Sequence, residues 1–135
     1  MLVARLHAIP SSDVAQWLLK PQPTTPGLVR RVVRSTLDDW GISSCADVAE
    51  LLASELATNA VPYASRPIEL RLMRTDVLLC EIKDDDHHLP VLRSASDTEE
   101  LGRGLKLVSS LARRWRANRT SAGKVVWFDL ALPRS

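Results

Sequence analysis

A glutamate and an asparagine lie four residues apart in the stretch Glu55-Leu-Ala-Thr-Asn59, among apolar neighbours. Residues at this spacing project from the same side of a helix, so both polar side chains are predicted to lie at the boundary of a buried stripe. Buried polar groups need partners, because unpaired ones cost several kcal/mol. One interpretation is a Glu–Asn pair at a helix edge. The other is that the Asn59 oxygen ligates a hard cation while Glu55 accepts a proton from a nucleophile.

Three successive carboxylates, Asp84 to Asp86, follow the apolar run that ends at Ile82. A carboxylate at the end of a central strand can accept hydrogen bonds from the amino group of a ligand, which is the functional interpretation of Asp84. A turn aspartate is the alternative. A metal-binding acidic loop is disfavoured, because the spacing and the glycine of a calcium loop are absent.

The segment Gly102-Arg103-Gly104 is predicted to precede a helix. Two glycines allow the backbone to approach a ligand closely, and the free N–H groups at a helix start favour phosphate. Arg103 adds a positive charge. A flexible hinge is the alternative interpretation. His87 and His88 have no matching ligands nearby in the sequence and are predicted to lie on the surface.

An arginine cluster surrounds Trp115 and consists of Arg113, Arg114, Arg116 and Arg119. It could contact RNA or DNA. The alternative is the solvated end of a helix, where cations interact favourably with the helix dipole.

Hydrophobic periodicity places these groups on a short series of elements. Amphipathic helices are predicted from Gly27 to Trp40, from Ser43–Ser44 to about Ala60–Tyr63, and from Gly104 to about Arg114. Strands are predicted at Ile68–Arg74, Val77–Ile82 and Lys124–Leu132, with a strand candidate at Val3–Ile9 and a loop with three prolines up to residue 27. Helices on one face of a mostly antiparallel, mixed sheet form an α+β two-layer sandwich.

The composition indicates one globular domain over residues 1–135. The hydrophobic share of 45% and the charged share of 25% are ordinary, and the net charge of +2 does not point to nucleic acid or membrane as a partner. No apolar run is long enough to cross a bilayer, and the start lacks the features of a signal peptide, so a cytoplasmic location is expected. Cys45 and Cys80 stand alone and are predicted to be small buried hydrophobic residues.

In this order the motifs resemble those of the GHKL ATPases, whose ATP-binding domain has the Bergerat fold. Glu55-Leu-Ala-Thr-Asn-Ala-Val61 resembles the N-box, Asp84 with the following loop resembles the G1 box, and Gly102-Arg-Gly-Leu-Lys-Leu-Val108 resembles the G2 box. The closing stretch Gly123–Leu130 is similar to the last strand of one branch, the anti-sigma-factor serine kinases and their stand-alone actinobacterial relatives.

The resemblance implies a role for each matching position. Asn59 would hold Mg²⁺ on the phosphates of ATP, Glu55 would act as the catalytic residue on a serine hydroxyl or water, and Asp84 would bind the adenine amino group. Residues 86–101 would form the lid over the nucleotide. The implied nucleotide-binding positions are Asn59, Asp84, Asp86, Gly102, Arg103, Gly104, Leu105 and Val125.

Four positions depart from the family pattern. Tyr63 replaces the usual histidine after the N-box, Pro62 precedes it, Asp86 replaces a small residue, and Val125 stands where relatives often have a threonine. The resemblance therefore implies either an ATP-dependent serine-protein kinase acting on an anti-sigma-factor antagonist of the STAS type, or a nucleotide-sensing module that transfers no phosphate. A sigma factor would be the other partner, a homodimer is possible, and a small nucleic-acid-binding protein is the third hypothesis.

Overall fold

The structure is a computed structural model that describes residues 2–6, 13–89 and 100–133. Its strands are β1 (Leu2–Leu6), β2 (Val14–Leu19), β3 (Ile68–Arg74), β4 (Val77–Asp84), β5 (Arg114–Thr120) and β6 (Gly123–Ala131). Its α-helices are α1 (Thr25–Asp39), α2 (Ala46–Ala60) and α3 (Glu100–Leu111), and a 3₁₀ turn, η1 (Ser43–Cys45), precedes α2.

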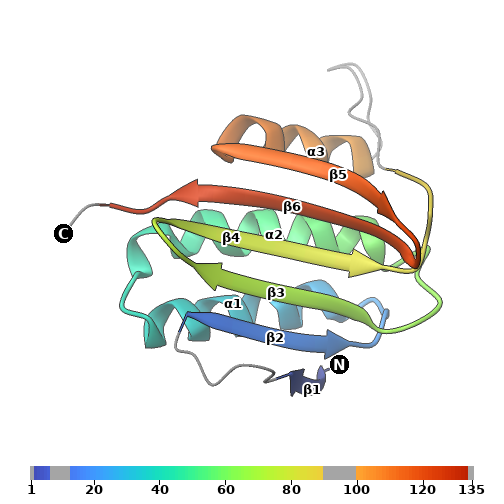
Figure 1. Cartoon of the computed structure of the whole chain (residues 1–135), viewed down its shortest axis with the longest axis horizontal. Helices are drawn as coiled ribbons and strands as arrows, with labels where there is room; N and C mark the ends of the chain where they lie inside the picture. The colour runs from blue at the N-terminus through green and yellow to red at the C-terminus, as the bar shows by residue number, and fades with distance from the viewer. Residues whose placement is uncertain (1, 7–12, 90–99, 134–135) are drawn as a thin grey trace.

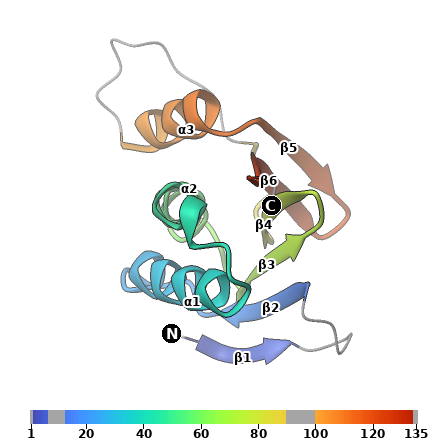
Figure 2. The same ribbon diagram turned by 90° about the vertical axis from the view of Figure 1, so that its left-hand side faces the viewer.

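The strands form a six-stranded sheet in the order β1-β2-β3-β4-β6-β5. Every pairing between neighbours is antiparallel over the described residues, so the sheet is more regular than the mixed sheet expected. Figure 2 shows the helices as one layer on a single face of the curved sheet, with α2 between α1 and α3. The predicted α+β two-layer sandwich is confirmed.

The core lies between these two layers. Alternate residues of the central strands point toward the helices and are fully buried, among them Leu70, Cys80 and Phe128. Val33 of α1 and Leu52 of α2 are equally buried on the helix side. Cys45 is half-buried and Cys80 is buried, both thiols are free, and burial raises the pKa of each.

The predicted ends of the helices differ from the observed ones in physically simple ways. Gly41 has a positive φ of 71° and follows α1, as expected of a glycine that ends a helix. Neither Ser43 nor Ser44 caps α2, because both lie in η1 and Cys45 is the capping position. The helix α2 ends at Ala60, before Pro62, which cannot continue it. The helix α3 begins at Glu100 and not at Gly104.

Two strands were not predicted. β2 lies within the segment that was interpreted as a loop up to residue 27, and it pairs with β1 and β3. β5 contains most of the arginine cluster, which was interpreted as a helix end. The strand candidate Val3–Ile9 is confirmed over its first residues as part of β1, and residues 7–9 lie outside the described residues. Over the described part of the chain, none of the helices has the length and apolar character that a membrane crossing requires.

Candidate functional site

Four elements bring their ends together at one side of the molecule. Figure 1 shows the C-terminal ends of α2 and β4, the N-terminal end of α3 and the start of β6 at the same side of the molecule. A hydrogen bond ties the segment after α2 to the segment after β4, because the Ser65 N–H donates to Asp85 Oδ1 at 2.8 Å. That bond, followed by one from the backbone of Arg66, lowers the pKa of the Asp85 carboxyl. The segment that follows the N-box stretch is therefore joined directly to the G1 stretch.

Asn59 lies in the last turn of α2 with its side-chain amide buried. Neither its oxygen nor its nitrogen has a hydrogen-bond partner among the residues that the structure describes. An unpaired buried polar group costs about 1–3 kcal/mol, so native proteins retain one where a ligand, ion or water satisfies it. The amide oxygen is a suitable ligand for a hard cation such as Mg²⁺, and the residue therefore fits the role that the resemblance implies.

Glu55 lies one turn earlier on α2, directly against α3. A methyl group added at Gly104 would lie 2.6 Å from Glu55 Oε2 and 3.4 Å from Glu55 Cβ. A side chain at this position would have to displace the Glu55 carboxylate, so Gly104 lets α3 pack against α2 with the glutamate in its observed position. Residues of the N-box and G2 stretches thus meet in a packing contact.

Asp84 ends β4 with a side chain that is 1% exposed. Its Oδ1 accepts a hydrogen bond from Lys124 Nζ at 3.0 Å and another from the Asp86 N–H at 2.8 Å. Its Oδ2 is buried and has no hydrogen-bond partner in the described part of the chain. Asp84 is therefore a buried ion-paired carboxylate that also makes the turn contact with the Asp86 N–H and keeps one acceptor unused.

Lys124 was not singled out in the sequence, although a signal existed. Residues 124, 126, 128 and 130 share one face of β6, and the other three are apolar and buried. A lysine on such a face requires an anionic partner, because an unpaired buried charge is costly. The antiparallel register places Lys124 directly opposite Asp84.

Asp86 faces Lys124 as well and does not turn outward. Its Oδ2 lies 3.2 Å from Lys124 Nζ, and its Oδ1 lies 3.0 Å from His88 Nδ1. The hydrogen bond with His88 and then the contacts with Lys124 lower the pKa of the Asp86 carboxyl. The negative charge of Asp86, which by itself would repel the phosphates of a nucleotide, is therefore neutralised in part within the protein.

Gly123, at the start of β6, packs against the backbone that follows Asp84. A methyl group added there would lie 2.0 Å from the Asp84 carbonyl oxygen and 2.6 Å from Asp85 Cα. Both neighbours are backbone atoms and cannot move aside cheaply. The sequence indicated Gly123 only as the boundary of a strand, and the structure shows that it sets the position of the Asp84 segment.

The G2 glycines lie inside α3. The N–H groups of the first helical residues of an α-helix have no partner within the helix, and in α3 these belong to residues 100–102, which include Gly102. They favour an anion at this end of the helix. The side chain of Leu105 is buried in the core, so only its backbone could contact a ligand. Most of the predicted lid, residues 86–101, lies outside the described residues.

Val125 does not support the role implied for it. Neighbouring residues of a strand point to opposite faces, and Lys124 points to Asp84, so Val125 points to the open face of the sheet. A contact between its side chain and a ligand at Asp84 is therefore not supported. The residue that stands beside Asp84 in its place is Lys124.

The arginine cluster is engaged in contacts within the protein. Arg113 forms a two-bond ion pair with Asp129, with both distances at 3.0 Å, and Arg114 contacts the same carboxylate. Arg119 donates to the His87 carbonyl oxygen at 3.1 Å, and His87 Nε2 lies 3.4 Å from the Ser121 carbonyl oxygen. The two contacts of His87 attach the β5–β6 hairpin to the segment that follows Asp84.

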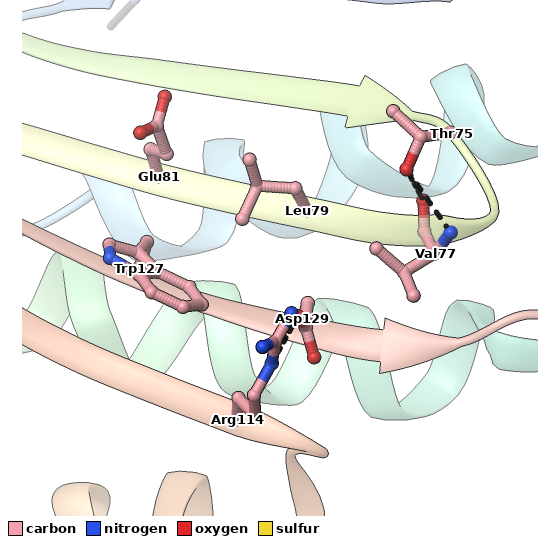
Figure 3. Close-up of a pocket in the computed structure, with 7 residues that line it drawn as sticks. All are labelled: Thr75, Val77, Leu79, Glu81, Arg114, Trp127 and Asp129. Carbon is pink, nitrogen blue, oxygen red and sulfur yellow. Dashed lines mark hydrogen bonds and ion pairs between the residues drawn. The ribbon is translucent and has the colours of Figure 1, made fainter.

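A separate pocket lies on the open face of the sheet. Figure 3 shows it between β4, β5 and β6, lined by Thr75, Val77, Leu79, Glu81, Arg114, Trp127 and Asp129. It shares no residue with the site at the ends of α2 and β4. Within the described residues there is also no group of three or more His, Cys, Asp or Glu side chains that could hold a metal ion.

Comparison with known proteins identifies one family. The family model described as the histidine kinase-like ATPase domain matches residues 19–130, which include every element from α1 to β5 and nearly all of β6. No curated protein matches the chain.

Proposed function

The chain belongs to the histidine kinase-like ATPase domain family, part of the GHKL superfamily, and we propose that it binds ATP with one magnesium ion where α2, β4 and α3 meet. The family supports an ATP-binding regulatory function. The observation that carries the proposal for this site is the buried amide of Asn59, whose two polar atoms have no partner in the described part of the chain.

The described residues provide what a nucleotide needs at three points. Asn59 would hold the magnesium ion, which neutralises phosphate charge when it is bound. The Asp84 Oδ2 would accept a hydrogen bond from an amino group of the base. The N–H groups at the start of α3 would bind phosphate oxygens.

We further propose that the protein is a serine-protein kinase. Glu55 would accept the proton of a partner's serine hydroxyl, whose oxygen would take the terminal phosphoryl group while ADP leaves. The position of Glu55 one turn before Asn59, against Gly104, supports this role. The partner would be an anti-sigma-factor antagonist of the STAS type, and a sigma factor would be the second partner. Incubation with radiolabelled ATP and candidate antagonist domains tests the kinase proposal, and no transfer despite tight ATP binding would refute it.

A nucleotide-sensing module without phosphoryl transfer is the second candidate. The observations that favour it are the acidic Asp86 beside the base site and Tyr63, which is 55% exposed where the family usually has a histidine. In this case Glu55→Ala would leave regulation of the partner intact, whereas Asn59→Ala would abolish it. Equal loss of regulation in both variants would mean that chemistry is required and would exclude the module.

A further inference from the structure

The two oxygens of the Asp84 carboxylate have different surroundings. Oδ1 accepts two hydrogen bonds, from Lys124 Nζ at 3.0 Å and from the Asp86 N–H at 2.8 Å. Oδ2 is buried and has no partner among the described residues. The protein therefore uses one oxygen for its own structure and leaves the other for a ligand.

Lys124 has no donor left for a ligand. An ammonium group has three protons, and Lys124 Nζ has three acceptors, namely Asp84 Oδ1 at 3.0 Å, Asp86 Oδ2 at 3.2 Å and the Asp86 carbonyl oxygen at 3.4 Å. Its side chain is 5% exposed. Any effect of Lys124 on a bound base must therefore act through Asp84.

The position of Lys124 is fixed by the backbone on which it stands. Lys124 is paired with Asp84 across the antiparallel strands β4 and β6. The preceding residue, Gly123, packs against the backbone of Asp84 so closely that no side chain fits between them. The ammonium group thus approaches the carboxylate from the β6 side only, where it meets Oδ1.

Resting on the ATP site proposed above, we infer that Lys124 is a positioning residue that fixes which atom of residue 84 faces the base, and so sets the preference for a base with an amino group. An ionised carboxylate oxygen only accepts hydrogen bonds. Adenine presents an amino group at carbon 6, which donates. Hypoxanthine presents a carbonyl oxygen there, which has no proton to give. The pair ATP and ITP therefore probes this contact together with N1, which accepts a hydrogen bond in adenine and donates one in hypoxanthine.

The test uses Asp84→Asn with and without Lys124→Met. In Asp84→Asn, Lys124 can bond only to the amide oxygen, so the NH₂ group takes the place of Oδ2 and becomes a donor. The preference should then invert, from ATP over ITP in the wild type to ITP over ATP. In the double variant only the Asp86 N–H still orients the amide. The hydrogen bond from the charged Lys124 is stronger than the one from the Asp86 N–H. Its loss should therefore reduce the inverted preference for ITP over ATP about tenfold.

Dissociation constants for both nucleotides, measured by calorimetry with magnesium, give the result. An ITP/ATP preference in the double variant within about twofold of that in Asp84→Asn would refute the role of Lys124. Circular dichroism and thermal melting check folding, and Lys124→Gln, which can either donate or accept, replaces Lys124→Met with the same expectation where that variant does not fold. A wild type that binds neither nucleotide would refute the ATP site itself, which is a separate outcome.

Discussion

Replacing Asn59 by leucine should stabilise the protein without nucleotide and abolish the stabilisation by nucleotide. The side chain has two buried polar atoms without a partner in the described residues, and each such atom costs about 1–3 kcal/mol. Leucine has the same number and branching of side-chain heavy atoms, is somewhat larger, and has no polar atom. Because leucine must still fit the same space, we expect a gain of about 1–3 kcal/mol in the free energy of unfolding and not the full sum. At about 4 °C per kcal/mol, the melting temperature should rise by about 4–12 °C.

The assay is thermal and urea denaturation of both proteins, with and without ATP and magnesium. A ligand at one hundred times its dissociation constant stabilises a protein by about 2.7 kcal/mol, so the wild type should gain about that much and Asn59→Leu nothing. Thr58→Val is the matched control. The Thr58 hydroxyl donates to the Ser54 carbonyl oxygen at 2.9 Å, so its removal should destabilise the protein by about 1 kcal/mol. An Asn59→Leu variant less stable than the wild type, or one still stabilised by ATP, would refute the reasoning.

Three further predictions concern neighbouring positions. Gly123→Ala should lower the free energy of unfolding by about 1–3 kcal/mol, because the added methyl group meets backbone atoms. Gly27→Ala, with open space around it, should raise the free energy of unfolding by about 0.5–1 kcal/mol. Urea denaturation measures both variants, and equal effects would contradict the packing argument. Glu55→Ala should lower phosphoryl transfer to a partner serine by about 10²–10⁴-fold, measured with radiolabelled ATP, and transfer at the wild-type rate would exclude Glu55 as the proton acceptor. The pKa of Asp85 is lowered in the folded protein, so Asp85 stabilises the fold at pH values above its ordinary pKa of 3.8. This stabilisation is lost as the pH falls through the pKa of Asp85 in the folded protein. Asp85→Asn should therefore flatten the pH dependence of the free energy of unfolding in this acidic range, and an unchanged profile would contradict the assignment.

Part of the fold could be predicted because some elements follow one simple pattern. β3 alternates buried and partly exposed residues along its length, so period-two alternation predicted its bounds. β2 escaped the same test. Its partly exposed positions include Val14 and Leu18, so apolar residues lie on both faces of the sheet and the alternation disappears from the sequence.

β5 was missed for a different reason. Leu111, Ala112 and Trp115 continue the helical spacing of α3, which predicted a helix end. The chain instead pairs with β6, where Trp115 and Ala117 face the core and Arg114 and Arg116 face outward. Charged residues of this kind are common on an edge strand, and pairing with β6 outweighs the local helical pattern.

The site was predicted as a set of motifs and not as a network. Asn59, Glu55 and Asp84 could be identified because their types and order are distinctive in the sequence. Lys124 could not be identified in the same way, because its role depends on the register between β4 and β6. A pairing across the sheet joins residues forty positions apart, and local patterns do not specify it.

The central claim is tested most directly by calorimetric titration of the wild-type protein with ATP, once with magnesium and once with EDTA. The account predicts a single saturable site that weakens at least about tenfold when magnesium is removed, because the metal joins Asn59 to the phosphates. A protein that releases or absorbs no binding heat and shows no thermal stabilisation at millimolar ATP with magnesium would contradict it.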